Sequence, residues 1–272
     1  NQYGSKIDLI EMMDNILPIE DIDISKEVEK SFIKSGIKIH KKTRVTQIKK
    51  LKTKLKVYLE ASGKESIVET DIVLSAVGVI GNIEKIGLEN IGVDTKNGSV
   101  LINDYNQTSI ENIYAIGDVS GPPWLAHVAS AQGHVAIEHA FGHFTKPLDY
   151  NNIPGCTYCQ PQVASLGMTE VKAKEAGYEV KIGRFNFSAS GKALAIGDSL
   201  GFVKIIFDAK YGELLGCHIV GSEATELIAE LATAKALETT WEEIATTVHA
   251  HPTLSEAIME AALDAYGQGI HQ

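Results

Sequence analysis

The first forty or so residues alternate between strand-like and helical patterns of apolar positions. Residues 6–12 form an apolar run that ends near Glu11 and predicts a short buried strand. Residues 25–35 carry apolar side chains at helical spacing before Gly36, which predicts a helix that stops there. Residues 37–40 predict a second strand, so the chain opens with a strand, a helix and a strand.

From residue 44 onward the pattern changes to alternation of apolar and polar positions. Residues 44–70 alternate in this way with a turn at Gly63, which predicts an antiparallel meander. Residues 71–77 (DIVLSAV) are apolar almost throughout and end at Gly78. A run of this kind predicts a buried strand in a sheet that is covered on both faces.

A turn-rich middle segment follows. Residues 79–108 lead to residues 113–116, which predict a buried strand, and then to a Gly-Asp dipeptide at residues 117–118. Residues 125–141 are rich in Ala and His at helical spacing and predict a helix. Residues 145–147 (Thr-Lys-Pro) predict the main domain boundary.

The remainder of the chain shows an α+β pattern. Strands are predicted near residues 178–187, 202–208 and 214–220, and helices near residues 224–237 and 253–266. The predicted fold class is therefore α/β in the first part and α+β in the last part.

Composition excludes several classes of protein. A length of 272 residues allows two domains. No apolar run approaches the roughly 20 residues of a membrane-spanning helix, and the first residues do not have the pattern of a signal peptide, so we expect no membrane association. A formal net charge of -10 would repel nucleic acid. Three cysteines are too few for a disulfide scaffold and suit the reducing cytoplasm, where we expect the protein.

Acidic side chains stand where two strands are predicted to end. Glu11 could accept hydrogen bonds from an adenosine ribose, as acidic residues do at that place in dinucleotide-binding folds, or it could be merely solvated. Asp118 could bind a hydroxyl group or cap a loop. The helix that begins near Leu125 would present backbone N–H groups from Trp124 to His127 to an electron-rich ring or an anion.

The segment Thr246–Ala257 (TTVHAHPTLSEA) holds the strongest candidate for proton transfer. His249 and His251 are one residue apart, and Pro252 follows. Glu256 has two possible roles that compete for one carboxylate. It could complete a T-x-x-E capping box with Thr253 at the start of the last helix, or it could orient His251 and raise its basicity.

Cys156 and Cys159 form a C-x-x-C motif, but an extended segment follows it, whereas a redox motif usually opens a helix. Together with His249 and His251 the pair could nominally supply four zinc ligands. No local feature brings the two pairs together, so two ordinary cysteines and no metal are expected. A zinc-binding or purely structural dimerisation module remains the rival from a different class.

These motifs, above all the HAHPTLSE block at residues 249–256, resemble the C-terminal part of the dihydrolipoamide dehydrogenases in the pyridine nucleotide-disulfide oxidoreductase family. The resemblance covers essentially the whole chain. Glutathione and mercuric reductases are rivals in that superfamily, but residues 254–256 follow the lipoamide form. The resemblance implies oxidation of dihydrolipoamide, the substrate carried by 2-oxo acid dehydrogenase complexes, through an enzyme disulfide and FAD to NAD.

The resemblance also implies roles for individual residues. Glu11, Val45 and Gly78 would bind NAD. Asp118 would bind the ribityl chain of FAD, and Trp124, Leu125, Ala126 and His127 would face the flavin ring. His251 would be the base, with Glu256 as its partner and a cis bond to Pro252, and it would act in the active site of a neighbouring subunit.

The implied organisation is that of a truncated enzyme. Residues 1–77 would be an incomplete Rossmann-like NAD-binding domain, residues 78–146 a central segment of the FAD domain, and residues 147–272 the dimerisation domain. Partners would be a second copy of the chain and the lipoyl domains of the complexes. The chain departs from the family pattern because it lacks the redox disulfide and the NAD glycine turn, so this fragment is expected to be inactive and to lack FAD.

Overall fold

The computed structural model describes residues 1–271, which fall into two compact units. One unit, called here the sheet unit, combines residues 1–73 with the residues from 151 onward. The other, called the loop unit, comprises residues 74–150. The domain identities expected for residues 1–77, 78–146 and 147–272 stay predictions.

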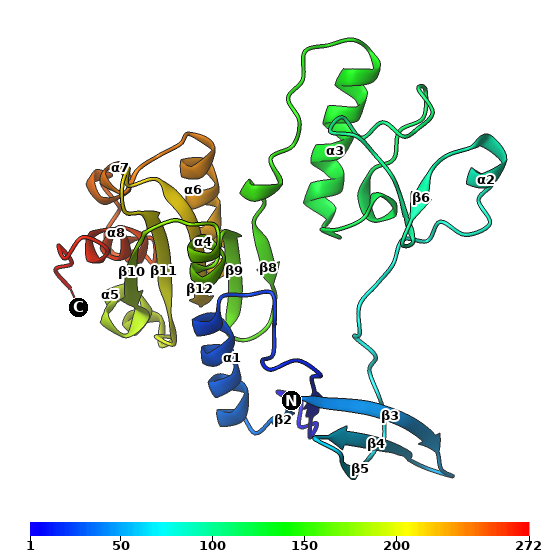
Figure 1. Ribbon diagram of the computed structural model, residues 1–272. Helices are drawn as coiled ribbons and strands as arrows, with labels where there is room; N and C mark the ends of the chain where they lie inside the picture. The colour runs from blue at the N-terminus through cyan, green and yellow to red at the C-terminus, as the bar shows by residue number, and fades with distance from the viewer. Residues whose placement is uncertain (272) are drawn as a thin grey trace. The chain divides into compact units, whose positions relative to one another are not determined.

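The sheet unit contains most of the regular structure (Figure 1). Its strands are β1 (Asp8–Ile10), β2 (Lys38–His40), β3 (Thr43–Lys50), β4 (Leu55–Ala61), β5 (Lys64–Thr70), β8 (Gly155–Thr157), β9 (Gln162–Gly167), β10 (Val180–Asn186), β11 (Gly201–Asp208) and β12 (Leu214–Gly221). Its helices are α1 (Ile22–Lys34), α4 (Glu170–Glu175), η3 (Phe187–Ala189), α5 (Gly191–Ile196), α6 (Ala224–Ala236), α7 (Trp241–Thr246) and α8 (Glu256–Asp264).

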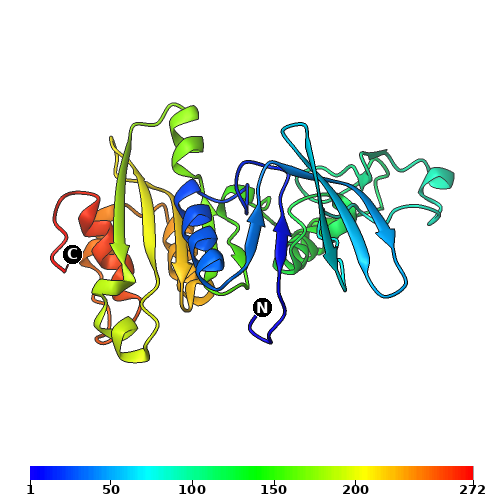
Figure 2. The same cartoon turned by 90° about the horizontal axis from the view of Figure 1, so that it is seen from below.

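A five-stranded antiparallel sheet in the order β10-β11-β12-β9-β8 forms the core of this unit. Side chains of a strand alternate between its two faces. In β11, Val203, Ile205 and Phe207 pack against α6, α7 and α8, whereas Phe202 and Ile206 belong to clusters on the other face, which α1 and α4 cover. Figure 2 shows α1 (blue) and α8 (red) on opposite sides of the sheet.

The strands and helices predicted for the first part of this unit are largely confirmed. β1 and β2 pair in parallel with α1 between them in sequence, although β1 is shorter than predicted and only partly buried. β3, β4 and β5 form the predicted antiparallel meander. Its second turn places Ser62 and Gly63 at positive φ, a conformation that glycine adopts without steric cost.

The prediction for the last part is also confirmed, with one shift. β10, β11, β12 and α6 lie where strands and a helix were expected. The final helix was predicted from residue 253, but α8 begins at Glu256 with Ser255 as its N-cap residue. The Thr253 hydroxyl donates instead to the carbonyl of Ala250 at 2.6 Å, so Thr253 does not cap the helix with its side chain.

The loop unit contains little regular structure. Its elements are α2 (Leu88–Ile91), β6 (Thr95–Lys96), β7 (Ser99–Val100), the 3₁₀ turn η1 (Gly117–Ser120) and α3 (Ala126–Ala140), and the 3₁₀ turn η2 (Tyr150–Asn152) lies at its end. The helix α3 confirms the prediction for residues 125–141. The strand predicted at residues 113–116 is wrong, because this segment makes only an isolated bridge between Tyr114 and Gln107.

The buried strand predicted at residues 71–77 is wrong as well. The side chains of Ile72, Leu74 and Val77 are 80%, 88% and 95% exposed. A strand forms only where neighbouring backbone accepts its hydrogen bonds, and no strand within residues 1–271 pairs with this segment. The apolar side chains of residues 71–77 favour burial, but most of them are exposed in the described part of the chain. None of the helices in that part is long and apolar enough to cross a bilayer.

Candidate functional site

The HAHPTLSE segment forms a compact turn between α7 and α8. The His251–Pro252 peptide bond is cis, as the resemblance implied. The His251 ring is 77% exposed, and its Nδ1 atom lies 2.9 Å from Oε1 of Glu256. Glu256 stands at the first position of α8, where the helix dipole favours a carboxylate. The two residues that were predicted to act together are therefore in direct contact.

Glu256 serves both of the roles that had been expected to compete. While Oε1 contacts His251, Oε2 accepts a hydrogen bond from the backbone N–H of Thr253 at 2.8 Å. The expectation that one carboxylate could not fill both roles is wrong, because its two oxygens face different donors. The hydrogen bond from Thr253, together with that from His251, holds the pKa of Glu256 below its usual 4.5, against the opposing effect of burial.

The ionised carboxylate fixes the tautomer of the histidine. A carboxylate only accepts hydrogen bonds, so Nδ1 of His251 must carry the proton that Glu256 accepts. In the neutral ring this leaves Nε2 with a free lone pair, and Nε2 has no hydrogen-bond partner within residues 1–271. This arrangement is compatible with a general base, since an exposed acceptor nitrogen is oriented by an anion on the opposite side of the ring.

The side chain of His249 is buried beneath the same turn and stabilises it through hydrogen bonds. Its side chain is only 5% exposed. Nε2 lies 2.8 Å from Oε1 of Glu230 in α6, and Nδ1 lies 2.9 Å from the carbonyl oxygen of Thr247. Both ring nitrogens of His249 have hydrogen-bond partners, so this side chain stabilises the turn. The spacing of the two histidines in the sequence did not show that His249 and His251 differ in this way.

The Gly117-Asp118 turn is held by a residue that sequence reasoning missed. Gln132, buried in α3, accepts a hydrogen bond from the Gly117 N–H at 2.7 Å and donates one to the Tyr150 hydroxyl at 2.8 Å. Gly117 has a φ of 72°, which favours glycine. The carboxylate of Asp118 is exposed at this turn, where it can accept hydrogen bonds from hydroxyl groups of a ligand.

The loop after Gly78 approaches other backbone segments closely at Gly81. A Cβ atom at Gly81 would meet the carbonyl of Gly98 and would lie 3.2 Å from the carbonyl oxygen of Asp118. Gly78 itself has a φ of 113° and open space around it. Gly81 thus allows its own segment to approach the backbone of Gly98 and Asp118 closely within the loop unit, and no motif in the sequence pointed to Gly81.

The start of α3 matches the predicted flavin contact only in part. Trp124 is 39% exposed, and Ala126 and His127 are also exposed, so this end of the helix is accessible in the loop unit. However, the N–H of Leu125 donates to the carbonyl of Pro123 at 3.0 Å. The expectation that all four N–H groups from Trp124 to His127 are free is therefore wrong for Leu125, because the chain forms a tight turn after the two prolines.

The predicted NAD-binding residues lie partly together. Glu11 follows β1, and its backbone carbonyl accepts a hydrogen bond from Thr43 N–H at the start of β3, the strand that carries Val45. Oε1 of Glu11 accepts a hydrogen bond from Met13 N–H at 2.7 Å, while the other oxygen has no hydrogen-bond partner among residues 1–271. The carboxylate can therefore still receive a ribose hydroxyl. Gly78 belongs to the loop unit.

The cysteine motif does not have the properties of a redox or metal site. Cys156 lies in β8 and Cys159 in the loop after it, and all three cysteines are free. Burial raises the pKa of both thiols, and nearby carboxylates, Glu226 and Glu20 for Cys156 and Glu20 for Cys159, add to the effect. A reactive cysteine has a lowered pKa. Within residues 1–271 no group of three or more His, Cys, Asp or Glu side chains is arranged to hold a metal ion.

Two family models match the chain. Residues 1–133 match the pyridine nucleotide-disulphide oxidoreductase family, and residues 153–262 match the dimerisation domain of the same family. Together the two matched ranges include the residues predicted to contact NAD and flavin and the His251–Glu256 pair.

Curated relatives agree with this result. The chain is 48% identical over 267 residues to a dihydrolipoyl dehydrogenase of Rhizobium etli, covering 97% of this chain and 56% of that protein. It is 45% identical over 273 residues to a dihydrolipoyl dehydrogenase of Bacillus subtilis, covering 100% of this chain and 58% of that protein. The chain thus spans less than two thirds of the length of these relatives.

Solved structures share the fold. The LpdA protein of Mycobacterium tuberculosis matches with a TM-score of 0.88 at 27% identity, over 96% of this chain and 56% of that one. The HOCl-induced flavoprotein disulfide reductase RclA of Escherichia coli matches with a TM-score of 0.88 at 22% identity, over 96% of this chain and 59% of that one. At that identity the second match concerns the fold alone.

Proposed function

The chain belongs to the pyridine nucleotide-disulphide oxidoreductase family, and we propose that it is part of a longer dihydrolipoyl dehydrogenase whose proton-transferring base is His251. The observation that carries the proposal is the contact between His251 Nδ1 and Glu256 Oε1 at 2.9 Å, which leaves Nε2 exposed and available. Activity, substrate and partners below belong to the longer protein.

The pair performs one defined step in this proposal. Nε2 of His251 takes the proton of a dihydrolipoamide thiol, and Glu256 stabilises the imidazolium ring that results. The thiolate then attacks one sulfur of an enzyme disulfide outside the present chain, which releases the other sulfur as a thiolate. Glu256 remains ionised during this step because Thr253 N–H and His251 both hold its pKa down.

The residues present fit both cofactors. Glu11 has an oxygen available for the NAD ribose, and Val45 and Gly78 would line the nicotinamide nucleotide. Asp118 would accept from the ribityl hydroxyls of FAD, and the exposed start of α3, from Trp124 to His127, would face the flavin ring. FAD, when bound, would supply the redox chemistry that links the dithiol to NAD. We propose that the chain alone binds no FAD.

The partners follow from the dimerisation domain. Residues 153–262 carry that description, so we propose a homodimer in which His251 serves the neighbouring subunit, and docking of lipoyl domains of 2-oxo acid dehydrogenase complexes. Three free cysteines support a cytoplasmic location. Sedimentation equilibrium of the chain should give a dimer, and a monomer at all concentrations would contradict the homodimer.

The activity is tested by the substitution His251→Ala in the longer protein. We expect loss of dihydrolipoamide oxidation by roughly a hundredfold or more, with retention of NADH oxidation by an artificial acceptor, because that half-reaction needs no thiol deprotonation. The exposed His143 offers a matched control, and His143→Ala should leave both activities unchanged. Equal loss of both activities in His251→Ala would assign His251 a structural role.

The cofactor proposal is tested on the chain as it stands. Purified protein incubated with FAD and then desalted should show no flavin absorption band, although its far-ultraviolet circular dichroism should show folded α and β structure. A retained flavin band would contradict the proposal that this part cannot hold FAD by itself.

A further inference from the structure

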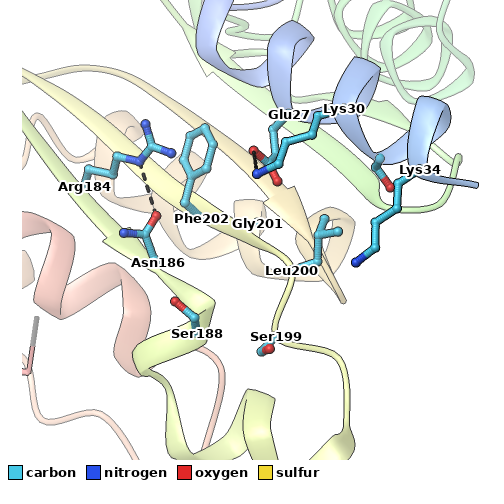
Figure 3. A pocket seen from close by; sticks show the side chains of 11 residues that line it. Glu27, Lys30, Lys34, Arg184, Asn186, Ser188, Ser199, Leu200, Gly201 and Phe202 are labelled. Carbon is cyan, nitrogen blue, oxygen red and sulfur yellow. Dashed lines mark hydrogen bonds and ion pairs between the residues drawn. The ribbon is translucent and has the colours of Figure 1, made fainter.

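A polar cavity lies in the sheet unit, away from the residues used above (Figure 3). It has a volume of about 410 Å³ and lies between α1 and the segments that end β10 and begin β11. The polar residues that line it are Glu27, Lys30, Ser31, Lys34, Arg184, Asn186, Ser188 and Ser199. Ligand pockets typically range from about 300 to 1,000 Å³, so a small molecule fits this space.

The charge of the cavity is opposite to that of the protein. Lys30, Lys34 and Arg184 carry three positive charges, and Glu27 is the only acidic residue in the lining. The net charge of the lining is therefore +2, whereas that of the whole chain is -10. A concave site of one sign concentrates ions of the opposite sign, so this site attracts anions that the rest of the surface repels.

The cations are only partly neutralised. Lys30 lies 3.7 Å from Glu27, a weak and exposed contact. Lys34 forms no ion pair within residues 1–271. Lys30 and Lys34 are four residues apart in α1, so both lie on the face that borders the cavity. Figure 3 shows the two side chains extending from α1 on the side of the cavity opposite Arg184.

Arg184 is held in a fixed orientation. Its guanidinium carbon lies 3.7 Å from the centre of the Phe202 ring, and its Nε donates to Oδ1 of Asn186 at 3.4 Å. These contacts occupy the face of the guanidinium group and one N–H, and no other hydrogen bond of its side chain is formed within residues 1–271. The terminal N–H groups can therefore bind two oxygens of an anion at once.

We propose that this cavity binds a small organic phosphate through its phosphate oxygens. The donors are those that phosphate prefers, namely one oriented guanidinium group, two amines and the hydroxyls of Ser188 and Ser199. A small molecule is favoured over an acidic protein segment because the cations converge on one cavity instead of following a surface track. The site does not depend on the proposed function, since it shares no residue with it.

The proposal is tested by calorimetric titration of the whole chain with inorganic pyrophosphate at low ionic strength. Binding should be measurable and should weaken as NaCl is added. The double variant K30Q/K34Q should raise the Kd roughly tenfold or more, because hydrogen bonds to charged groups are strong. Lys26 and Lys38 are exposed and do not line the cavity, so K26Q/K38Q is a control with the same change of charge.

A variant that is expected to strengthen binding separates an effect on the site from an effect of misfolding. Glu27→Gln removes the one carboxylate of the lining and should lower the Kd roughly two- to fivefold, which a destabilised protein would not do. Equal weakening in both double variants would assign binding to diffuse surface charge and overturn the proposal. Absence of pyrophosphate binding, or tighter binding of a polyglutamate peptide than of pyrophosphate, would also overturn it.

Discussion

Replacement of Lys204 by methionine should destabilise the sheet unit strongly. Lys204 lies in the middle of β11, and its side chain is only 2% exposed. Its amine contacts Asp21 at 2.9 Å, Asp23 at 2.7 Å and Glu170 at 2.9 Å. Burial alone would lower the pKa of Lys204, but these three hydrogen bonds outweigh it and raise the pKa well above 10.5. The amine thus joins the start of α1 and α4 to the sheet.

The size of the effect follows from the exposure of the three acids. Removal of one member of a buried ion pair typically costs about 3–5 kcal/mol, because the other charge stays buried without a partner. Asp23 and Glu170 are 34% and 25% exposed, so water can partly solvate them, but Asp21 is 1% exposed and cannot be solvated. Lys204→Met therefore leaves one fully buried carboxylate without its partner. We expect the loss in the free energy of unfolding to lie near the lower end of that range, at about 3 kcal/mol.

The assay is urea denaturation followed by the fluorescence of Trp241, which stacks on Tyr266 in the sheet unit. The background substitution Trp124→Phe removes the only other tryptophan. The exposed Lys26 provides a control, since Lys26→Met should change the free energy of unfolding by no more than about 0.5 kcal/mol. In a double-mutant cycle, Asp21→Asn should remove a large part of the penalty of Lys204→Met.

The pH dependence gives an independent check. Burial would raise the pKa of Asp21, but hydrogen bonds, chiefly from Lys204, outweigh it and lower this pKa from the usual 3.8. The pKa of Glu170 is lowered from the usual 4.5 by hydrogen bonds from Lys174 and Lys204, which outweigh the effect of burial. Their stabilisation is thus present above these usual values and is lost as pH falls. Lys204 has a raised pKa, so its stabilisation is complete below 10.5 and is lost only above it. The penalty of Lys204→Met should be largest near neutral pH and shrink below about pH 4. A loss under about 1 kcal/mol, or one independent of pH, would refute the electrostatic argument.

Three further outcomes are expected. Gly183→Ala should cost about 1–3 kcal/mol in urea unfolding because the added methyl group meets the α8 backbone, whereas Gly191→Ala, with open space, should change stability by less than about 1 kcal/mol; equal effects would contradict the packing argument. Gln132→Leu should increase amide hydrogen exchange around the Gly117 turn, and unchanged exchange would show that another group holds it. Cys156 and Cys159 should react with iodoacetamide roughly tenfold more slowly than glutathione at pH 7.5, and reaction as fast as glutathione would restore the redox interpretation.

The pattern of apolar positions predicted correctly those strands that pair with another strand in the described part of the chain. It predicted two further strands that do not form. The meander and the strands β10 to β12 were predicted correctly because alternation encodes which face is buried. Residues 71–77 and 113–116 have equally apolar patterns but make no ladder of backbone hydrogen bonds. Hydrophobicity reports a preference for burial, whereas a strand also requires a neighbour, and a single sequence does not state whether that neighbour is present.

Long-range polar contacts could not be predicted from spacing. Lys204 interrupts the apolar segment FVKIIFD, and a lysine inside a buried strand needs carboxylate partners. Those partners, Asp21 and Glu170, lie far away in the sequence. Gln132 and Gly81 were missed for the same reason, because their roles arise from segments that meet only in the fold.

The site itself was predicted better than its mechanism. The HAHPTLSE block identified His251 and Glu256 as partners. The expected competition between the two roles of Glu256 does not occur, because a carboxylate has two oxygens and each of them accepts a different hydrogen bond. The backbone contact supports the contact with His251, because the hydrogen bond from Thr253 N–H lowers the pKa of Glu256 and so favours its charged form. An ionised Glu256 accepts a hydrogen bond from Nδ1 of His251, which leaves Nε2 as the proposed base. Under the proposed function, the capping interaction at the start of α8 is therefore a condition for proton transfer, since the backbone N–H of Thr253 that orders the helix start also favours the charged form of Glu256, which orients His251.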